Sequence, residues 1–470
     1  MNKIQNERTV NLALNLNIDD QACSQIVAGA VKLLDETGIR LKSDIARKFL
    51  SAFSGVQFKN ERVYFSSDLM HDFLEKMKQH TKQPDPDAPF YQGQGFCCFN
   101  WADASKGIIR KPTETDLVKA VRFLDTYGVE QHLPPVALSE YSPTVRDLQG
   151  TRICMENSPA IGAPTHTPGE AELDYYKQMS NVIDRKIWVL AMLIKSPMEF
   201  DGNVLEFMIA HKDDKEFLIE MTGGMPSPGS TSPLSFPAAQ MQGLAEDLAA
   251  SFFMHAIHGE FEPPYLRSDP FDLQYLNYTV GSPEYALLDQ LSRRLHQYIT
   301  GAPRDWAYFH SMGKWPDQQA THERTITCWL QALAGAVHFK GSGQLAHDEV
   351  YSLEQVVIDR TIMVGAERLV KGLKFQNSVE DNCKIVEEGL ESGNFLMHDT
   401  TLENFVDFYS QRELFPPMNL GQWQKHNEPT PLTMAGEVIE KHLEKNTFQR
   451  DQKEIEELRR ICDHAEKVLL

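Results

Sequence analysis

The chain has 470 residues, of which 41% are hydrophobic and 24% are charged, the proportions of a globular protein with one large domain or several smaller ones. Its formal net charge of −20 disfavours nonspecific binding to nucleic acid or to an anionic membrane surface. The seven cysteines form no C-x-x-C pair, which predicts reduced thiols in a cytoplasmic protein. The N-terminal residues contain no apolar signal segment, and no apolar run approaches the roughly 18 residues of a membrane span, so neither export nor membrane insertion is expected.

An N-terminal extension of helices and a small hairpin is predicted for residues 1–110. Residues 19–37 place apolar side chains on one helical face and end before Gly38, and 67–79 form a second candidate helix. Beyond a hydrophilic linker, the segments 96–101 and 107–110 are candidates for the two strands of the hairpin.

A regular alternation of strands and helices begins after Thr113, an N-cap candidate with Asp116 three residues later. Strands are predicted at 131–137, 160–165, 187–194, 217–222, 264–267, 306–310, 337–340 and 393–398. Helices are predicted between them at 143–156, 169–183, 200–211, 236–258, 283–299, 319–334 and 352–372. This alternation is typical of a (β/α)8 TIM barrel, so we expect an α/β barrel over residues 111–425. A C-terminal helical tail, 426–470, follows, and its charged amphipathic segment 449–470 is expected to pack on the barrel or on a subunit.

Polar side chains stand at or just beyond the predicted strand ends. Since the carboxyl ends of barrel strands converge on one pocket, these residues are candidates for a shared site, although each alone is equally consistent with a hydrogen-bonded loop residue. They are His166, Glu220, His310, Lys340, His347 and His398.

Aromatic residues gather in the same part of the sequence. They fit either of two uses: filling the core, or forming a box whose ring faces hold a quaternary ammonium, each contact contributing ~0.5–2 kcal/mol when desolvated. They are Trp306, Tyr308, Phe309, Trp315, Phe339 and Tyr351, with Phe99 and Trp101 from the hairpin.

Other kinds of site are weakly indicated. His255 and His258 are three residues apart and the remaining histidines are loosely spaced, without an H-E-x-x-H motif or a cysteine and histidine frame, so no metal is expected. The glycines at 223–224 and 341–343 match neither a P-loop nor G-x-G-x-x-G, and the chain has no G-x-S-x-G nucleophile elbow.

Several segments resemble the trimethylamine methyltransferase family in order and spacing over most of the chain. They are 34–41, 229–235 leading into 243–247, 281–284, 317–320 with Glu323, 341–345 with Ser352, Glu354, Gln355 and Asp359, and 398–402. The resemblance implies a TIM barrel that moves a methyl group from an amine to the Co(I) of a separate corrinoid protein.

Archaeal members of this family carry pyrrolysine inside the barrel, at a place that falls in or beside residues 308–314 of this chain. Every residue here is a standard amino acid. The chain therefore resembles the branch that demethylates quaternary amines such as glycine betaine, proline betaine or carnitine.

On this basis we expect a cytoplasmic, homo-oligomeric methyltransferase for a small quaternary amine, with glycine betaine first among the candidates. The substrate-binding residues are expected to be Tyr308, Phe309, Phe339 and Tyr351 as a cation box, and His166, His310, Lys340 and His347 at the carboxylate end, with Glu220 nearby. The corrinoid belongs to a partner protein, and no tightly bound cofactor or metal of its own is expected. A metal-dependent barrel hydrolase or lyase and a noncatalytic betaine-binding barrel remain the alternatives.

Overall fold

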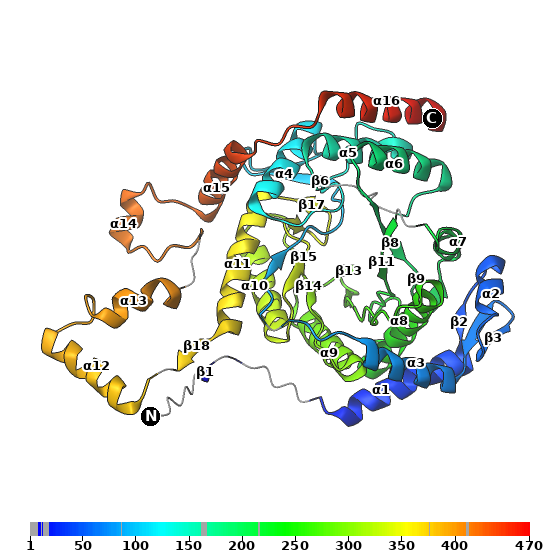
Figure 1. Ribbon diagram of the computed structural model, residues 1–470, viewed down its shortest axis with the longest axis horizontal. Coiled ribbons are helices and arrows are strands. Elements are labelled where there is room, and N and C mark those ends of the chain that lie inside the picture. The colour runs from blue at the N-terminus through cyan, green and yellow to red at the C-terminus, as the bar shows by residue number, and fades with distance from the viewer. Residues whose placement is uncertain are drawn as a thin grey trace.

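The computed structural model describes residues 8–10, 12, 18–85, 87–160, 167–214, 217–375, 377–409 and 413–470. Figure 1 shows a ring of helices around short strands, with an arm of helices extending from one side. The ring consists of α4 (Glu114–Tyr127), α5 (Pro143–Asn157), α6 (Glu170–Val182), α7 (Gly202–Ala210), α8 (Phe236–His258), α9 (Pro283–Thr300), α10 (Gln318–Leu333) and α11 (Leu353–Lys371).

The helices begin where local capping residues predict. Thr113 and Asp116 form the expected capping box at the start of α4. Asp317 accepts hydrogen bonds from the backbone N–H groups of Gln319 and Ala320 at the start of α10. The seven helices predicted between strands are all confirmed, because caps and apolar periodicity depend on residues that are near one another in the sequence.

Inside the ring, the strands pair in parallel. β8 (Ile187–Met192) pairs with β11 (Phe217–Thr222) over their full lengths. β14 (Trp306–Tyr308), β15 (His338–Lys340) and β5 (Tyr91–Gln92) form a second parallel set, which Gly93 extends by a bridge to Glu130. Hydrogen-bonded strands of the described residues thus form separate parallel arcs and do not close into a barrel.

The remaining predicted strands have different outcomes. The segment 131–137 forms an isolated bridge at Val136, and 264–267 forms no paired strand. The segment 160–165 lies outside the described residues after Ala160.

The strand predicted at 393–398 is wrong. Gly393 caps the C-terminus of α12 (Val379–Ser392) and His398 caps the N-terminus of α13 (Asp399–Phe408). Instead, β5, from the predicted N-terminal extension, lies beside β15 in the parallel set. A two-residue strand is too short to give a pattern, so only its long-range pairing identifies it.

The rest of the N-terminal region covers one side of the ring. Residues 19–37 form α1 (Asp20–Lys32) and a π-helical turn (Leu33–Thr37), and the second predicted helix is α3 (Ser67–His80), after α2 (Asp44–Leu50). β2 (Ile39–Arg40), β3 (Val56–Lys59) and β4 (Arg62–Phe65) join β9 (Ile194–Lys195) and β10 (Glu199–Phe200) in a five-stranded sheet. The predicted hairpin is observed as β6 (Asn100–Asp103) and β7 (Ile108–Arg110), which join β16 (Gln344–Leu345) and β17 (Val350–Tyr351) in a four-stranded sheet. One further pair is formed by β12 (Phe271–Asp272) and β13 (Asn277–Tyr278).

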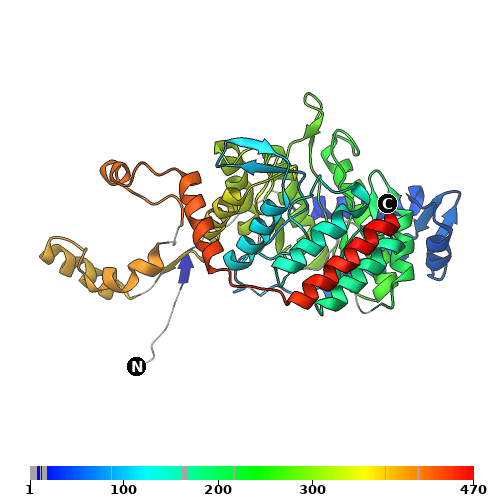
Figure 2. The same ribbon diagram turned by 90° about the horizontal axis from the view of Figure 1, so that it is seen from above.

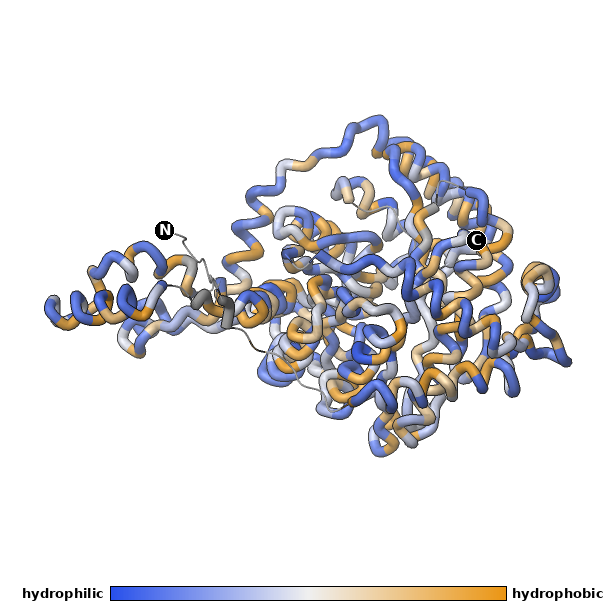
Figure 3. The backbone as a smooth tube through the Cα atoms, turned by 60° about the horizontal axis from the view of Figure 1, so that its bottom comes forward, coloured by the Kyte–Doolittle hydropathy of each residue, from blue (hydrophilic) through white to orange (hydrophobic). Residues whose placement is uncertain are grey.

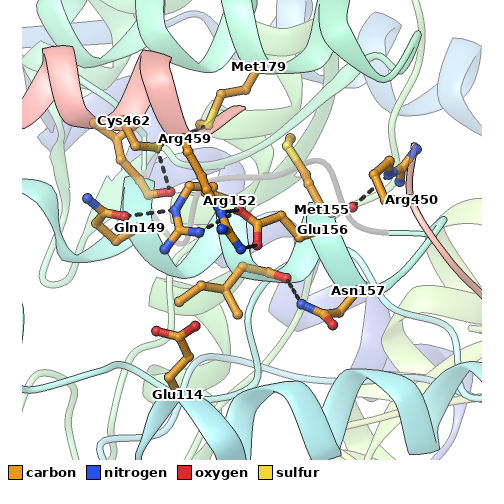
Figure 4. Close-up of polar contacts among 12 residues, drawn as sticks. Glu114, Gln149, Arg152, Met155, Glu156, Asn157, Met179, Arg450, Arg459 and Cys462 are labelled. Carbon is orange, nitrogen blue, oxygen red and sulfur yellow. Dashed lines mark hydrogen bonds and ion pairs between the residues drawn. The ribbon is translucent and has the colours of Figure 1, made fainter. Parts of the chain in front are cut away.

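The C-terminal helix α16 (Gln452–Leu469) packs on α5 and α6, as the amphipathic pattern predicts (Figures 2 and 4). Leu458, Ile461 and Cys462 are buried in this contact. At the same contact, Glu156 of α5 accepts hydrogen bonds from Arg152 of the same helix and from Arg459 of α16 (Figure 4). This helix therefore packs on the outside of the ring of helices, away from the strands (Figure 1).

An arm extends from the body after α11. It begins with β18 (Leu373–Phe375), which pairs antiparallel with β1 (Arg8–Val10), and continues through α12, α13 and α14 (Leu420–Lys425). α15 (Pro431–Lys445) then returns to pack on α4 and α11. Figure 3 shows apolar residues along the arm, where α12 buries only Gly389 and α14 buries none of its residues. Among the described helices of the whole chain, none combines the length and apolar character that crossing a membrane requires.

Candidate functional site

An ion pair between two strands lies inside the ring of helices. Tyr308 and Lys340, the last residues of β14 and β15, are neighbours in register. The Nζ atom of Lys340 lies 2.5 Å from Oε1 of Glu220 on β11. Lys340 and Glu220 therefore neutralise each other, and their side chains retain 27% and 33% exposure, which shows that they border a cavity.

Two adjoining cavities meet at these residues. A small one of about 30 Å³ is lined by Phe96, Trp188 and the trio Glu220, Tyr308 and Lys340. A larger one of about 880 Å³ shares that trio and extends toward the loops that precede the strands. The small cavity is the centre of the candidate site, since it lies where the carboxyl ends of the parallel strands converge.

Aromatic rings form much of the wall. The Phe96 and Tyr308 rings are parallel with centroids 6.4 Å apart, and Trp188 stacks on His132 at 5.2 Å. The Tyr265 hydroxyl donates to the Tyr308 hydroxyl at 3.1 Å, which fixes the Tyr308 ring at the junction of the two cavities. Ring faces with this placement suit a desolvated cation.

A buried polar cluster lies beyond Tyr308, at the strand ends. Arg267 binds Asp269 through two hydrogen bonds, and its Nη2 atom lies 3.2 Å from Nδ1 of His310. His347 Nε2 is 3.6 Å from Oδ2 of Asp269. Arg267 also lies over the Tyr308 ring, 5.0 Å from its centroid, so the cluster adjoins the aromatic wall.

Burial and the Arg267 charge determine the protonation of His310. Together they hold the pKa of His310 well below its usual value, so the imidazole is neutral. Its Nδ1 atom accepts from Arg267, and the ring proton is therefore on Nε2. Within the described residues, Nε2 of His310 and Nη1 of Arg267 have no hydrogen-bond partner, which leaves two buried donors available to an anionic group.

The same cluster contains the one set of three side chains, among those described, whose ligand atoms are close enough for a metal: His310, His347 and Asp348, within 4.8 Å. A metal on Nε2 of His310 would require the proton on Nδ1, where it would face the N–H of Arg267. This hydrogen bond disfavours a metal on His310, and the free Nε2–H group suits a ligand with an acceptor oxygen, such as a carboxylate.

Backbone strain is concentrated in the loop that carries His347. Ala346, His347 and Asp348 have φ angles of 51°, 51° and 73°, in the left-handed region that non-glycine residues rarely adopt. Each such residue costs of the order of 1–3 kcal/mol, and strain of this kind clusters at binding sites.

Buried carboxylates hold the loops at the strand ends. Asp359 accepts from the Gly343 N–H and pairs with Arg324, which fixes the turn after β15. Asp247 accepts from the N–H groups of Gly224 and Leu266, which ties the end of β11 to segment 264–267. Both carboxylates belong to the sequence segments that resemble the methyltransferase family, so these segments shape the loops around the cavity.

The structure brings together five of the predicted site residues. Tyr308, Lys340 and Glu220 line the cavities, while His310 and His347 belong to the cluster beside them. His166 lies outside the described residues.

Three predicted box residues lie elsewhere. Phe309, Phe339 and Tyr351 are 1%, 0% and 0% exposed, in the core between strands and helices. Phe309 and Phe339 alternate with the inward Tyr308 and Lys340 along their strands, and therefore point outward from the cavity. Their assignment to the cation box is corrected on this ground.

Five further residues of the site were not predicted from the sequence: Phe96, Trp188, Tyr265, Arg267 and Asp269. Three of them, Trp188, Tyr265 and Arg267, are within predicted strands. Their place on a strand could therefore be predicted, but the sequence did not show that their side chains point inward. Phe96 begins the predicted hairpin strand 96–101, and Asp269 lies two residues beyond the predicted strand 264–267, so position was a signal for them too. What the sequence lacked was the long-range packing that brings them to Tyr308 and Arg267.

Comparison with known proteins now gives the family. The model of the trimethylamine methyltransferase family matches residues 3–464. The chain belongs to this family. The resemblance in its sequence segments is thereby confirmed.

Individual proteins of the family align with the chain over different lengths. A trimethylamine methyltransferase of Methanosarcina barkeri (strain Fusaro) is 32% identical over 198 residues, which cover 42% of this chain and 39% of the relative. One from Desulfitobacterium hafniense is 23% identical over 406 residues, 81% of this chain and 80% of the relative. Among solved structures, Methanosarcina barkeri monomethylamine methyltransferase aligns with 98% of this chain and 95% of its own at 12% identity, with a TM-score of 0.45. The match to the first relative thus spans about two fifths of that protein.

Proposed function

We propose that this protein transfers a methyl group from a quaternary amine, with glycine betaine first among the candidates, to the Co(I) of a separate corrinoid protein. Family membership supports the reaction type. The observation that carries the choice of substrate is the mixed surrounding of Tyr308: the parallel Phe96 ring at 6.4 Å, and the unpaired donors of His310 and Arg267, whose side chains also adjoin the Tyr308 ring. A betaine has the matching two ends, a quaternary ammonium and a carboxylate.

The proposed reaction requires little acid–base catalysis by the residues of this chain. A quaternary nitrogen leaves as a neutral tertiary amine, so no proton has to be supplied. The corrinoid of the partner supplies the nucleophile. The residues of this chain hold the amine, direct one methyl group and exclude water. The family resemblance implies a pyrrolysine in or beside residues 308–314 of the archaeal members, and the standard amino acids of this chain support a substrate that needs no further activation.

Charge leaves the nitrogen in the transition state, and a wall that held the cation too strongly would slow the reaction. Two carboxylates line the small cavity, and each has a partner: Glu220 pairs with Lys340 and Glu130 with His132. Lys340 is consequently a partner of Glu220 in this proposal, and the carboxylate of the substrate is assigned to His310 and Arg267, with His347 beside them.

We also propose that the parallel arcs belong to a (β/α)8 TIM barrel in which residues 91–94 supply the strand that the sequence placed at 393–398. The continuous order β14, β15, β5 and Glu130 supports this. The carboxyl ends of the strands are the proposed docking face for the corrinoid protein, in a cytoplasmic setting and without a cofactor bound by this chain itself.

A homo-oligomer is proposed on the basis of the arm. Its exposed apolar side chains are Val379, Val386, Leu390, Phe395, Leu396, Met397, Leu402, Phe405, Val406, Phe408, Tyr409, Phe415 and Leu420. A stable interface buries roughly 800 Å² on each partner, which a set of this size supplies. The proposed occupant is a second copy of the chain, because identical arms can cover each other in a symmetric contact.

The decisive experiment mixes the purified protein with Co(I) cobalamin and glycine betaine and follows the visible spectrum. A methyl-cobalt spectrum that requires the amine is expected, with proline betaine, carnitine and trimethylamine as comparison substrates. If no quaternary amine gives this spectrum while calorimetry shows glycine betaine binding, the protein is a noncatalytic binding barrel and the proposal fails. Transfer from trimethylamine alone would overturn the choice of substrate.

A further inference from the structure

The larger cavity opens on the side of the molecule opposite to the proposed docking face. Its outer lining comes from residues 259–263, before segment 264–267, and from 302–305, before β14. These loops lie at the amino ends of the strands, whereas His310 and Arg267 lie at the carboxyl ends. Lys82, Gln83 and Glu260 on the rim are exposed, so the cavity is open to solvent.

The cavity reaches the candidate site. Glu220, Tyr308 and Lys340 line its inner end and line the small cavity as well. With a volume of about 880 Å³, the cavity is within the range of small-molecule sites. A small amine therefore has room to pass from the solvent to Tyr308 without crossing the carboxyl ends of the strands.

Carboxylates line this cavity at increasing depth. Glu260 is exposed at the rim, Glu262 is half-buried, and Glu220 lies at the inner end in its ion pair. Glu262 forms no hydrogen bond or ion pair with any described residue. Burial first, and then repulsion from Glu260 and Glu220, raise the pKa of Glu262 to about 7, the behaviour of a carboxylate without a compensating cation.

The lining favours an organic cation over a metal ion. Among the described residues, the only three-ligand cluster with metal spacing is the one at His310, so these carboxylates are too dispersed to ligate one ion. Aromatic residues stand between them: Phe261, Tyr265 and Trp306, with Tyr265 stacked on Trp306 at 4.7 Å. An alkylated ammonium matches the dispersed negative charge through its cationic nitrogen and the apolar aromatic side chains through its methyl groups.

We propose that this cavity is a cation-binding vestibule through which the quaternary amine reaches Tyr308 from the amino ends of the strands, with Glu262 as its principal binding residue. The inference rests on the proposed function for the identity of the amine. It implies that amine and product exchange while the corrinoid protein stays docked at the opposite face.

The test measures binding directly, by titration calorimetry with tetramethylammonium chloride at pH 8. Glu262→Lys is expected to weaken binding at least tenfold and Glu262→Gln severalfold. The control is Glu444→Lys, an exposed charge reversal on α15, which contacts α4 and α11 and does not line the cavity. Its affinity should stay within twofold of the parent. Circular dichroism of each variant establishes that it is folded.

The outcomes separate this inference from the proposed function. If folded Glu262→Lys binds tetramethylammonium as tightly as the parent does, the vestibule is overturned, whether or not methyl transfer to cobalt is observed. If binding depends on Glu262 but no quaternary amine methylates Co(I), the vestibule stands and the proposed function fails. A parent protein that does not bind tetramethylammonium at all also overturns the vestibule.

Discussion

At the scale of the residue, protonation determines which ligand the site suits. His310 resembles a metal ligand in its proximity to His347 and Asp348. Its hydrogen bond with Arg267 instead makes it a neutral donor through Nε2. A single neighbouring guanidinium thus converts a possible cation site into one for a carboxylate.

Replacing His310 by Phe should weaken glycine betaine binding by about 1.5–3 kcal/mol, roughly 10- to 150-fold, because one hydrogen bond to a charged group is lost. Calorimetry with glycine betaine measures the loss. Tetramethylammonium, which has no carboxylate, is the control ligand, and its affinity should remain within twofold. Equal losses for both ligands would contradict the assignment of the carboxylate to His310.

Glu262 should give a pH dependence to cation binding. With its pKa raised to about 7, the side chain is mostly neutral below that pH and anionic above it. Tetramethylammonium affinity should therefore rise between about pH 6 and pH 8 in the parent protein and be flatter in Glu262→Gln. The other acidic, basic and histidine side chains that face the cavity are Glu220, Glu260, Asp305, Lys82, Lys340, His80 and His296, and the variant separates their titration from that of Glu262. The same slope in both proteins would refute the prediction.

At the scale of the element, buried ion pairs stabilise the loops that follow the short strands. The turn after β15 is held by Asp359 and Arg324, whose side chains are both 0% exposed. Removing one partner of such a pair leaves a buried charge that has no compensation.

Asp359→Ala is accordingly expected to lower the free energy of unfolding by about 3–5 kcal/mol. Urea denaturation followed by circular dichroism measures this change. Glu36→Ala is a matched control, since Glu36 pairs with Lys32 at an exposed position, and it should cost less than about 0.5 kcal/mol. A loss for Asp359→Ala as small as that of the control would show that the loop does not depend on the pair.

At the scale of the whole molecule, the arm carries many apolar side chains that remain exposed to solvent in the single chain. Exchanging Leu390 and Phe405, which are 70% and 54% exposed, for lysine should shift the protein from an oligomer to a monomer. Light scattering after size exclusion measures the mass. Leu287→Lys alters an exposed leucine on α9 in the body and should leave the oligomer intact. An unchanged mass for the double variant would exclude the arm as the interface.

How much of the fold could be predicted depends on the range of the interactions involved. Capping residues and apolar spacing predict the helices from α5 to α11. Short apolar runs followed by polar residues predict the carboxyl ends of β14 and β15. The false strand at 393–398 has an apolar run as well, Phe395, Leu396 and Met397. In the structure that run is an exposed turn between α12 and α13.

The candidate site was predicted in part for the same reason. Tyr308 and Phe309 are adjacent aromatic residues on one strand, and the sequence offers no means of deciding which of them points inward. Phe96 and Glu262 reach the cavities from two separate segments, and Arg267, on the same segment as Glu262, lies over the Tyr308 ring. Only long-range packing brings these residues to Tyr308 and Lys340.

The sequence by itself determined the family, the run of helices and the strand ends where polar residues gather, because these depend on residues close together along the chain. Only the tertiary structure decided which face of each strand lines the cavities, that β5 lies beside β15, and that His310 is a neutral donor beside Arg267. Those features depend on contacts between distant segments and on the loss of solvent around them, which no local pattern specifies.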